Sequence, residues 1–505
     1  MCGFVFASSS MGSETIVKKA LDDTAFRGPD AQGLVRHNNY YFGHNRLKIL
    51  DLSDHANQPF VSRSGRFVIL FNGEIYNFKS LAKKHSIALS TSCDTELLVE
   101  LFEKIGPSML DELNGMFAIV IYDKKEDEYF VARDRLGIKP LFYLDSSKGV
   151  VFSSEISSIV SMLPSVELDE FALRQYRKMR SLFGDRTFYK GVYTFPAGHY
   201  SYKGKITQYW SLPEGEQPAP SAEELKELIT DAINLRMLAD VPVGSYLSGG
   251  LDSSIVAALA GDVHTWSVGQ KHQNEFEWST IVSEYISVNH HNVLVKAEEY
   301  QAALKLMVQK RKEPLSVPNE VLIYLMTQRV KEKNTVVLSG EGADELFFGY
   351  DQIFRWAYNN QWDLESFANY YSYSDIDDLE VVEDAVAPFV GKDAITTVAR
   401  FFQIAHLHGL LRRLDFATML CGVEARVPFV DHRLVERLAG VSFKYRMAND
   451  IVKARLKRVF SDILPDEIIH RKKEGFPVDL SNVLGREKGT YRDFFEVNLY
   501  LFGEN

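Results

Sequence analysis

The sequence is poor in cysteine and has no long apolar run. Its three cysteines, Cys2, Cys93 and Cys421, form no CxxC pair, which argues against a disulfide framework and against a cysteine-rich zinc site. No stretch approaches about 18 consecutive apolar residues, so we expect no membrane span. The first residues, MCGFVFASSSMG, lack the basic start and long apolar core of a signal peptide. These absences predict a protein of the reducing cytoplasm.

A surplus of positive charge is missing as well. The chain has 57 Lys and Arg against 68 Asp and Glu, a net charge of −11, and we therefore expect no nucleic-acid partner. The hydrophobic fraction of 46% and the charged fraction of 25% are ordinary for a globular protein. Because domains usually hold about 100–200 residues, the length of 505 residues predicts two or three domains.

The first half of the sequence mixes strand and helix patterns. Short β-prone runs such as FVILF (67–71) and FAIVIY (117–122) occur together with helical patterns near 13–22 and 94–105. This mixture predicts an α+β domain over residues 1–210. The segment that follows, SLPEGEQPAPSA (211–222), contains three prolines and predicts a linker.

Strands and helices alternate in the second half. We expect a helix over 222–239, then a strand, a glycine turn and a helix that begins near 252. This order predicts a parallel sheet covered by helices, and hence an α/β domain over residues 223–505. The expected strands of this sheet are 243–247, 263–268, 292–296 and 335–339.

Cys2 directly follows the initiator methionine. Removal of Met1 would leave a cysteine with a free α-amine, which can take the proton of its own thiol because the α-amino pKa lies near about 8. A cysteine at position 2 is weak evidence by itself, since most such cysteines are accidental.

Polar residues elsewhere in the first half can complete a site around this thiol. The Arg46 guanidinium can bind a substrate carboxylate, and Asp94, at the start of a predicted helix, can bind an α-ammonium group. Asn72 and Gly73 follow an apolar strand, where an amide and a backbone N–H can form an oxyanion hole. RGPD (27–30) alone could be a plain surface turn, and NGE (72–74) alone could be a hairpin turn. These separate readings do not explain why the motifs occur together. We therefore interpret the set as a glutamine-hydrolysing site.

A candidate phosphate loop, LSGGLDSS (247–254), lies between a predicted strand and a predicted helix. Gly249 and Gly250 let the backbone approach phosphate oxygens, and the helix N-terminus offers free N–H groups. Asp252 would be repelled by phosphate unless Mg²⁺ lies between them. Because the GxxxxGK[ST] lysine is absent, this is not a kinase-type P-loop, and the loop suits ATP that is cleaved between its α and β phosphates.

A second loop, SGEGADELFFGY, begins at Ser339, at the end of another predicted strand. Parallel strands place their carboxyl ends on one edge of a sheet, so this loop should face LSGGLDSS. Asp344 is then a second candidate Mg²⁺ ligand, although an acidic helix cap would also explain it. Glu341 adds a carboxylate to the same crevice, and Val268, at the end of a neighbouring strand, can border the adenine.

The motifs of both halves resemble those of the asparagine synthetase family, in the same order and over nearly the whole chain. MCG, RGPD, HNRLKI, FNGEIYN, SCDTE and RDRLGIKPLFY are similar to its glutaminase domain. LSGGLDSS, SGEGADELFFGY, GVEARVPFVD and DIVKARLKR are similar to its synthetase domain. The resemblance implies a four-layer αββα sandwich of the N-terminal-nucleophile hydrolase class, followed by a domain like those of the adenine-nucleotide α-hydrolases.

The resemblance also implies the roles of individual residues. Cys2 is the implied nucleophile, and Lys453 and Glu341 are implied to act on the phosphate and on the acyl-adenylate. The implied Mg²⁺ ligands are Asp252 and Asp344. The residues implied to hold glutamine are Arg46, Asn72, Gly73, Glu74 and Asp94, with Asn72 and Gly73 as oxyanion donors. The residues implied to hold ATP are Leu247, Ser248, Gly249, Gly250, Asp252, Ser253, Ser254, Val268, Ser339 and Gly340.

The implied reaction converts aspartate, glutamine and ATP into asparagine, glutamate, AMP and pyrophosphate. Ammonia would pass between the two sites through a tunnel, and the resemblance is compatible with a homodimer. RKKEGF (471–476) resembles a basic closing segment. The family's amino-sugar relatives, which join a similar glutaminase to an isomerase, are disfavoured by LSGGLDSS, because isomerisation needs no ATP cleavage.

Departures from the family pattern leave the acid acceptor open. EPLSVPNEVLIY (313–324) contains no arginine where the family has one, and the other departures are Phe26, Lys48, Glu275, Phe348 and Lys457. A glutamine-dependent amidotransferase that acts on another carboxylate, such as a uronic acid of a surface polysaccharide, is the alternative. A β-lactam-forming enzyme is disfavoured because such enzymes have typically lost Cys2. A catalytically silent binding protein is disfavoured because Cys2, Asp252 and Asp344 are all present.

Overall fold

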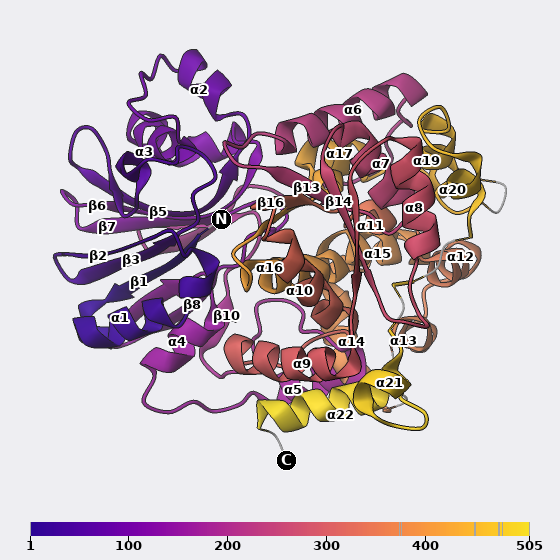
Figure 1. Ribbon diagram of the computed structural model, residues 1–505. Coiled ribbons are helices and arrows are strands. Elements are labelled where there is room, and N and C mark those ends of the chain that lie inside the picture. The colour runs from indigo at the N-terminus through magenta and orange to yellow at the C-terminus, as the bar shows by residue number, and fades with distance from the viewer. Residues whose placement is uncertain are drawn as a thin grey trace.

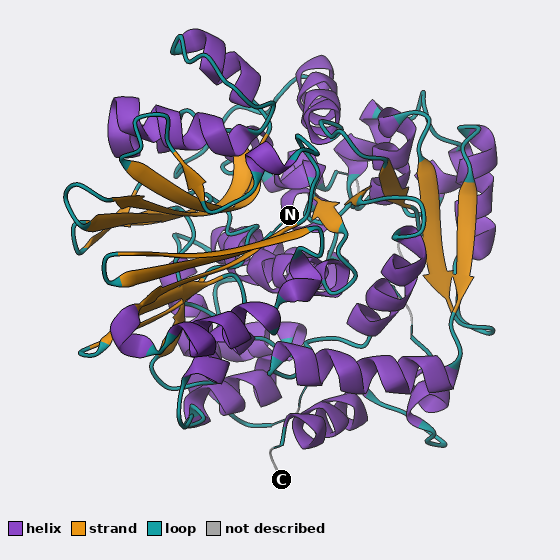
Figure 2. Ribbon diagram, turned by 60° about the vertical axis from the view of Figure 1, so that its left-hand side comes forward, coloured by secondary structure: helices purple, strands orange, loops and turns teal. Residues whose placement is uncertain are grey.

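The computed structural model describes residues 2–372, 374, 376–448, 451–472, 475–476 and 478–503. The first half contains two stacked antiparallel sheets, and the second half contains one parallel sheet surrounded by helices (Figures 1 and 2). The N-terminus lies near the centre of the molecule, where the two halves meet (Figure 1). A nucleophile at the start of the chain is therefore placed beside the second half rather than at a remote surface.

The first antiparallel sheet has β1 near its middle, paired on one side with β3 and on the other with β9. Helices α1 (Glu14–Asp22) and α4 (Ile156–Met162) cover its outer face (Figure 1). The strands, in their order across the sheet, are β10 (Val192–Thr194), β8 (Phe142–Ser146), β9 (Gly149–Ser153), β1 (Gly3–Ser8), β3 (Tyr40–Arg46) and β2 (Ala31–His37).

The second antiparallel sheet is centred on the long strands β5 and β6. Helices α2 (Phe78–Lys84) and α3 (Asp94–Ile105) cover its outer face (Figure 1). The strands, in order, are β12 (Lys205–Gln208), β11 (His199–Tyr202), β7 (Glu128–Arg133), β6 (Gly115–Asp123), β5 (Phe67–Ile75) and β4 (Phe60–Val61).

The continuous apolar run of β5 reflects burial on both of its faces. Ile69 and Phe71 pack in the cluster under α3, whereas Val68 and Leu70 pack between the two sheets. Side chains alternate between the two faces of a strand, so a strand in the middle of four layers needs apolar residues at every position. The predicted αββα arrangement is thereby confirmed.

The second half contains the predicted parallel sheet, with helices on both sides. Its central strand β13 pairs in parallel with β14 and with β16. The strands, in order, are β15 (His290–Leu294), β14 (His264–Gly269), β13 (Val243–Tyr246), β16 (Val336–Leu338) and β17 (Glu424–Arg426). The four strands expected from the sequence are present, and β17 is an additional edge strand that the sequence pattern did not predict.

Helices make up most of the remaining chain. Residues 209–221, which overlap all but the last residue of the predicted linker 211–222, form neither helix nor strand. No helix among the described residues is long and apolar enough to cross a membrane. The other helices are α5 (Glu170–Met179), α6 (Ala222–Arg236), α7 (Leu251–Ala260), α8 (Phe276–Tyr285), α9 (Ala297–Arg311), α10 (Asn319–Val330), α11 (Ala343–Phe347), α12 (Asp351–Asn359), α13 (Leu364–Tyr371), α14 (Leu379–Val386), α15 (Ala394–Phe401), α16 (Leu407–Met419), α17 (His432–Leu438), α18 (Phe443–Arg446), α19 (Ala454–Val459), α20 (Asp466–His470), α21 (Leu480–Leu484) and α22 (Tyr491–Phe502).

The two halves share one apolar core. A single cluster contains Val17 and Ile156 from under the first sheet together with Leu414 and Val427 from the second half. Burial of apolar surface is the dominant favourable contribution to such association. The shared core therefore holds the two predicted sites in a fixed relation to each other.

Candidate functional site

Cys2 lies directly before β1 and is 8% exposed. Its backbone nitrogen donates a hydrogen bond of 3.1 Å to the side-chain oxygen of Asn72. Burial raises the pKa of the Cys2 thiol, while the N-terminal amine and the Leu47 N–H act in the opposite direction. Removal of Met1 would turn the nitrogen that contacts Asn72 into the free α-amine.

Asn72 and Gly73 lie side by side on β5, as the sequence predicted. The side chain of Asn72 is fully buried, and its Nδ2 has no acceptor among the described residues. A Cβ at position 73 would lie 2.1 Å from the Met116 carbonyl oxygen, so only glycine fits there. Buried amide donors are almost always paired; one left unpaired next to a thiol is suited to an oxyanion.

Two carboxylates, Glu74 and Asp94, lie close to this pair. The Ile75 N–H donates to Asp94 Oδ2 at 2.8 Å, but burial has the larger effect and raises the pKa of Asp94 to about 6. Burial and the charge of Asp94 also raise the pKa of Glu74 well above its ordinary value. A pair of carboxylates in this state gains from a bound cation, and the α-ammonium group of an amino acid is one.

Arg46, the expected carboxylate-binding residue, is engaged with the loop that follows it. Its Nη1 donates to the Ser53 carbonyl at 2.7 Å and to Asn57 Oδ1 at 2.8 Å. Its Nη2 donates to the carbonyls of Leu50, at 3.1 Å, and Asp51, at 2.5 Å. All four terminal N–H groups thus have acceptors. Arg46 therefore has to exchange one of these bonds before it can bind a substrate carboxylate.

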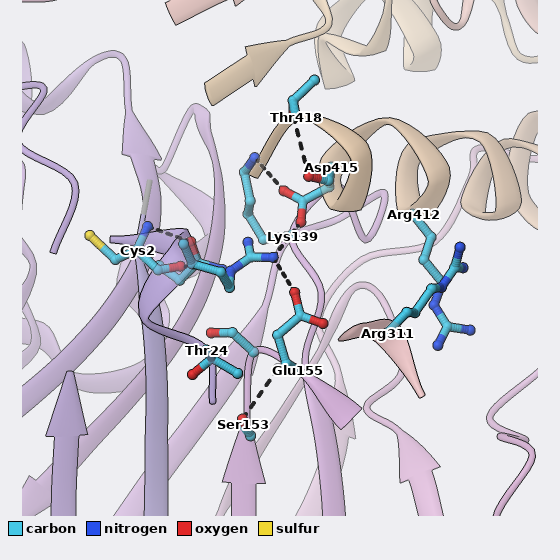
Figure 3. A network of polar contacts seen from close by, with 12 residues as sticks. Cys2, Thr24, Lys139, Ser153, Glu155, Arg311, Arg412, Asp415 and Thr418 are labelled. Carbon is cyan, nitrogen blue, oxygen red and sulfur yellow. Dashed lines mark hydrogen bonds and ion pairs between the residues drawn. The ribbon is translucent and has the colours of Figure 1, made fainter. Parts of the chain in front are cut away.

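Arg27, in the RGPD motif, is completely buried and supports Cys2. Its Nε donates to the Cys2 carbonyl at 3.1 Å, and its Nη1 lies 2.5 Å from Glu155 and 2.9 Å from Asp415. Lys139 lies 3.3 Å from the other oxygen of Asp415. Figure 3 shows Asp415 reaching in from α16 toward Lys139 of the first half. The sequence predicted only a turn here, and it did not identify this link to the second half.

The two predicted nucleotide loops face each other in the second half. A Cβ on Gly340 would lie 3.0 Å from the backbone nitrogen of Ser253, so the loops after β13 and β16 are in contact. The hydroxyls of Ser253 and Ser254 donate to the Gly250 carbonyl at 3.1 and 2.7 Å, and Ser248 Oγ lies 3.1 Å from Ser253 Oγ. These bonds hold the turn that leads into α7, with its free N–H groups at the crevice.

Other predicted nucleotide-binding residues line the same sheet edge. Leu247 is buried, and its N–H donates to the Trp266 carbonyl at 2.8 Å. Val268 lies at the carboxyl end of β14 and is also buried. The Ser339 N–H donates to the Arg426 carbonyl at 2.9 Å. The ends of β13, β14 and β16 therefore meet where the sequence placed the nucleotide.

Asp252 and Asp344 converge on one cation, the ammonium group of Lys453. Lys453 Nζ lies 2.5 Å from Asp344 Oδ1 and hydrogen-bonds to Asp252. Burial lowers the pKa of Lys453, but the two carboxylates outweigh burial and leave it raised. A Cβ on Gly349 would lie 1.7 Å from Asp344 Oδ1, so glycine is required at this close approach. Two carboxylates that share one cation fit the oxygen-rich coordination of Mg²⁺.

Glu341 pairs with an arginine that the sequence did not single out. The side chain of Arg413, on α16, lies 2.5 Å from Glu341 Oε1. Arg471, the first residue of RKKEGF, donates to the Gly249 carbonyl at 3.2 Å and lies 4.6 Å from the ring of Trp278. Lys473 and Glu474 of that motif lie outside the described residues.

Comparisons with known proteins agree with this two-site organisation. Residues 1–210 match the family described as Glutamine amidotransferase domain, and residues 224–499 match the family described as Asparagine synthase. The chain is 27% identical to asparagine synthetase [glutamine-hydrolyzing] 1 of Bacillus subtilis, over 97% of this chain and 89% of that protein. It is 27% identical to asparagine synthetase [glutamine-hydrolyzing] 3 of the same organism, over 94% and 87%. It is 30% identical to asparagine synthetase [glutamine-hydrolyzing] of Zea mays, over 89% and 72%.

Proposed function

We propose, from the premise that the chain belongs to the asparagine synthase family, that this protein is a glutamine-hydrolysing asparagine synthetase. It converts aspartate, glutamine and ATP into asparagine, glutamate, AMP and pyrophosphate. The observation that carries the proposal is the presence, on one shared core, of the Cys2–Asn72 pair and the Asp252–Lys453–Asp344 cluster. The Cys2–Asn72 pair is suited to hydrolysing an amide, and the Asp252–Lys453–Asp344 cluster is suited to binding a nucleotide.

The Cys2 site releases ammonia from glutamine. The thiolate attacks the side-chain carbonyl carbon of glutamine, and the α-amine of Cys2 takes the thiol proton and passes it to the departing ammonia. Nδ2 of Asn72 and the N–H of Gly73 stabilise the oxyanion. Water then hydrolyses the thioester to glutamate. The unpaired, buried Nδ2 of Asn72 supports this assignment.

Glutamine is held by charged groups around the thiol. Asp94 and Glu74 take the α-ammonium group, in line with their raised pKa values. Arg46 takes the α-carboxylate after it exchanges one of its bonds to the loop 50–57. A bidentate contact between guanidinium and carboxylate offsets the loss of that bond.

The second site activates aspartate. A side-chain carboxylate oxygen of aspartate attacks the α-phosphorus of ATP, and pyrophosphate leaves; ammonia then attacks the acyl carbon, and AMP leaves. The loops 247–250 and 339–342 hold the nucleotide, and Lys453 stabilises the charge that develops on phosphate. Glu341 accepts a proton from the attacking ammonia. The contact between the two loops supports this arrangement.

Asp252 and Asp344 are the residues that would hold Mg²⁺. Bound there, the ion would neutralise charge on the phosphates of ATP. Lys453, which these carboxylates share as their cation, has to move away from at least one of them for the ion to bind. The cytoplasm suits this chemistry, because its reducing conditions keep a catalytic thiol free. A homodimer and the absence of a nucleic-acid partner stay predictions from the sequence.

Formation of AMP that depends on both glutamine and aspartate tests this function. Purified protein is incubated with ATP, Mg²⁺, glutamine and one acid at a time, and AMP, pyrophosphate and the amide product are measured. We expect asparagine with aspartate and no AMP above background without an acid. AMP formation with a uronic acid but not with aspartate would instead establish the alternative acceptor.

A further inference from the structure

Arg413 carries the positive charge nearest to the candidate catalytic carboxylate Glu341. Its side chain comes from the middle of α16 and is 10% exposed. Nη2 lies 2.5 Å from Glu341 Oε1, and Nη1 lies 3.3 Å from the side-chain oxygen of Asn319. Nε is buried and has no acceptor among the described residues. One edge of the guanidinium, formed by Nε and Nη2, is thus only half used.

Two neighbouring arginines are already neutralised by other carboxylates. Arg311 lies 2.9 Å from Glu320 and 3.6 Å from Glu313, and Arg412 pairs with Glu313. Both of these glutamates are buried and belong to the segment 313–324, which supplies no lysine or arginine of its own. Of the three arginines, Arg413 is the one that contacts Glu341 and the nucleotide crevice.

Aspartate brings a second negative charge into a crevice that is already acidic. Its side-chain carboxylate is consumed in the reaction, while its α-carboxylate stays ionised in a crevice to which Glu341, Asp252 and Asp344 contribute negative charge. The ammonium group of Lys453 is shared between Asp252 and Asp344. A carboxylate in this region is stable only with a cation of its own, and Arg413 offers one with two N–H groups on a single edge.

We propose that Arg413 is the specificity-determining residue that binds the non-reacting α-carboxylate of the acceptor, with Asn319 fixing the orientation of the guanidinium. Nε and Nη2 bind the two carboxylate oxygens, and Glu341 is released from its ion pair with Arg413. Release frees the Glu341 carboxylate to accept a proton from ammonia. This inference rests on the proposed function, because it takes aspartate as the acceptor.

A comparison of two acceptors with and without the α-carboxylate tests the assignment. The acids are aspartate and 3-aminopropanoate, which lacks only that carboxylate. Both are measured as substrates in AMP formation, or, where turnover is too slow, 3-aminopropanoate is measured as an inhibitor competitive with aspartate. The variants are Arg413→Met and Arg413→Lys, and Arg412→Met serves as the matched control from the same helix, since Arg412 pairs with Glu313.

We expect Arg413→Met to lower kcat/KM for aspartate roughly 100-fold, mainly by raising KM. For 3-aminopropanoate, kcat/KM (or the inhibition constant, where it is measured as an inhibitor) should change only a few-fold. Arg413→Lys should recover part of the loss, because lysine restores the positive charge but not the pair of N–H groups that makes a bidentate contact with a carboxylate. Arg412→Met should leave the ratio between the two acids unchanged.

Equal losses for both acids in Arg413→Met and Arg413→Lys would overturn the assignment, because they would show that Arg413 only holds Glu341 in place. Wild-type protein that uses other acids but forms no AMP with aspartate would overturn the proposed function and the assignment with it. The two failures are therefore told apart by the wild-type protein alone.

Discussion

The carboxylate of Glu74 and the guanidinium of Arg426 lie 3.1 Å apart and join the two halves of the molecule. Glu74 lies beside the candidate glutamine pocket on β5, and Arg426 ends the edge strand β17 of the parallel sheet. The backbone carbonyl of Arg426 also accepts the Ser339 N–H of the nucleotide loop. A single buried residue thus contacts one predicted residue of each site.

Replacement of Arg426 by methionine is expected to weaken both glutamine use and the fold. Arg426 also pairs with the buried Glu424 at 2.5 Å, so its loss removes the guanidinium that two buried carboxylates share, at a cost of about 3–5 kcal/mol. Denaturant unfolding measures the stability, and the glutaminase rate measures the site. Glu74→Gln, which removes one charge of the pair, should raise the KM for glutamine with a smaller loss of stability. Wild-type stability in Arg426→Met would contradict this role.

Glutamine hydrolysis should fail on the acid side of about pH 6. Burial raises the pKa of Asp94 to about 6, so the carboxylate is charged above this pH and neutral below it. Only the charged form attracts the α-ammonium group of glutamine, and kcat/KM for glutamine should therefore fall as the pH drops through 6. The glutaminase rate without ATP, measured from pH 5 to 8, checks this. Asp94→Asn should hydrolyse glutamine slowly at every pH, and its kcat/KM should show no fall as the pH drops through 6. If the variant shows the same fall as wild-type protein, a group other than Asp94 causes it.

Cys2→Ala and Asp252→Asn should separate the two half-reactions. Cys2→Ala removes the nucleophile, so asparagine formation from glutamine should disappear while formation from ammonium chloride persists. Asp252→Asn weakens the proposed Mg²⁺ and nucleotide site, so AMP formation should stop with either nitrogen source. Both are followed as AMP release at saturating aspartate. Loss of the ammonia-driven reaction in Cys2→Ala would show that the sites are not independent.

The sequence predicted the layers and most strand-end residues because both leave local signals. Runs such as 67–71 are apolar at every position, which is typical of strands buried on both faces, and the glycine loops follow such strands directly. β17 has no such signal: Glu424 and Arg426 are charged, and they can be buried because the folded structure supplies ion-pair partners, including each other and Glu74.

Long-range ion pairs leave no local trace in a single sequence. Arg27 and Asp415 are 388 positions apart. Arg413 lies in a helix, where the sequence does not distinguish a buried arginine from a solvent-exposed one. Arg46 was found by its motif, but its hydrogen bonds to the loop 50–57 depend on the folded loop and were not predicted. The contacts between the halves thus became visible only in the structure.

Loss of the Lys453 charge should tighten divalent-metal binding in the absence of nucleotide. Lys453 is the shared cation of Asp252 and Asp344, so Lys453→Met leaves two adjacent carboxylates that repel each other and attract a metal ion. Calorimetric titration with Mn²⁺ should show a stronger site than in wild-type protein, while AMP formation falls by about 100-fold or more. Arg458→Met, which removes an exposed positive charge from α19, the helix that follows Lys453, is the matched control. Equal Mn²⁺ affinities for wild type and Lys453→Met would exclude Asp252 and Asp344 as a metal pair.

Asp415→Asn should weaken the ion pairs between the two halves. It should also make the free energy of unfolding depend less on pH in the acid range. Burial raises the pKa of Asp415, but Arg27 and Lys139 outweigh it and leave the pKa below its ordinary value. An acid whose pKa is lower in the folded state stabilises the protein at pH values above its unfolded pKa of about 4. This stabilisation is lost as the pH falls below that value toward the folded pKa. The variant removes the carboxylate that Lys139 contacts and leaves Arg27 with Glu155 alone, which costs about 3–5 kcal/mol at pH 7. Thermal or urea unfolding between pH 7 and pH 3 measures both effects.

The control for this prediction is Asp22→Asn, which removes a surface ion pair with Lys18. Exposed pairs contribute about 0–1 kcal/mol, so this variant should unfold like wild-type protein. Because Arg27 also holds the Cys2 carbonyl, Asp415→Asn should lower the glutaminase rate as well, even though Asp415 belongs to the second half. A normal glutaminase rate in a destabilised Asp415→Asn protein would show that Arg27 keeps its position through Glu155 alone.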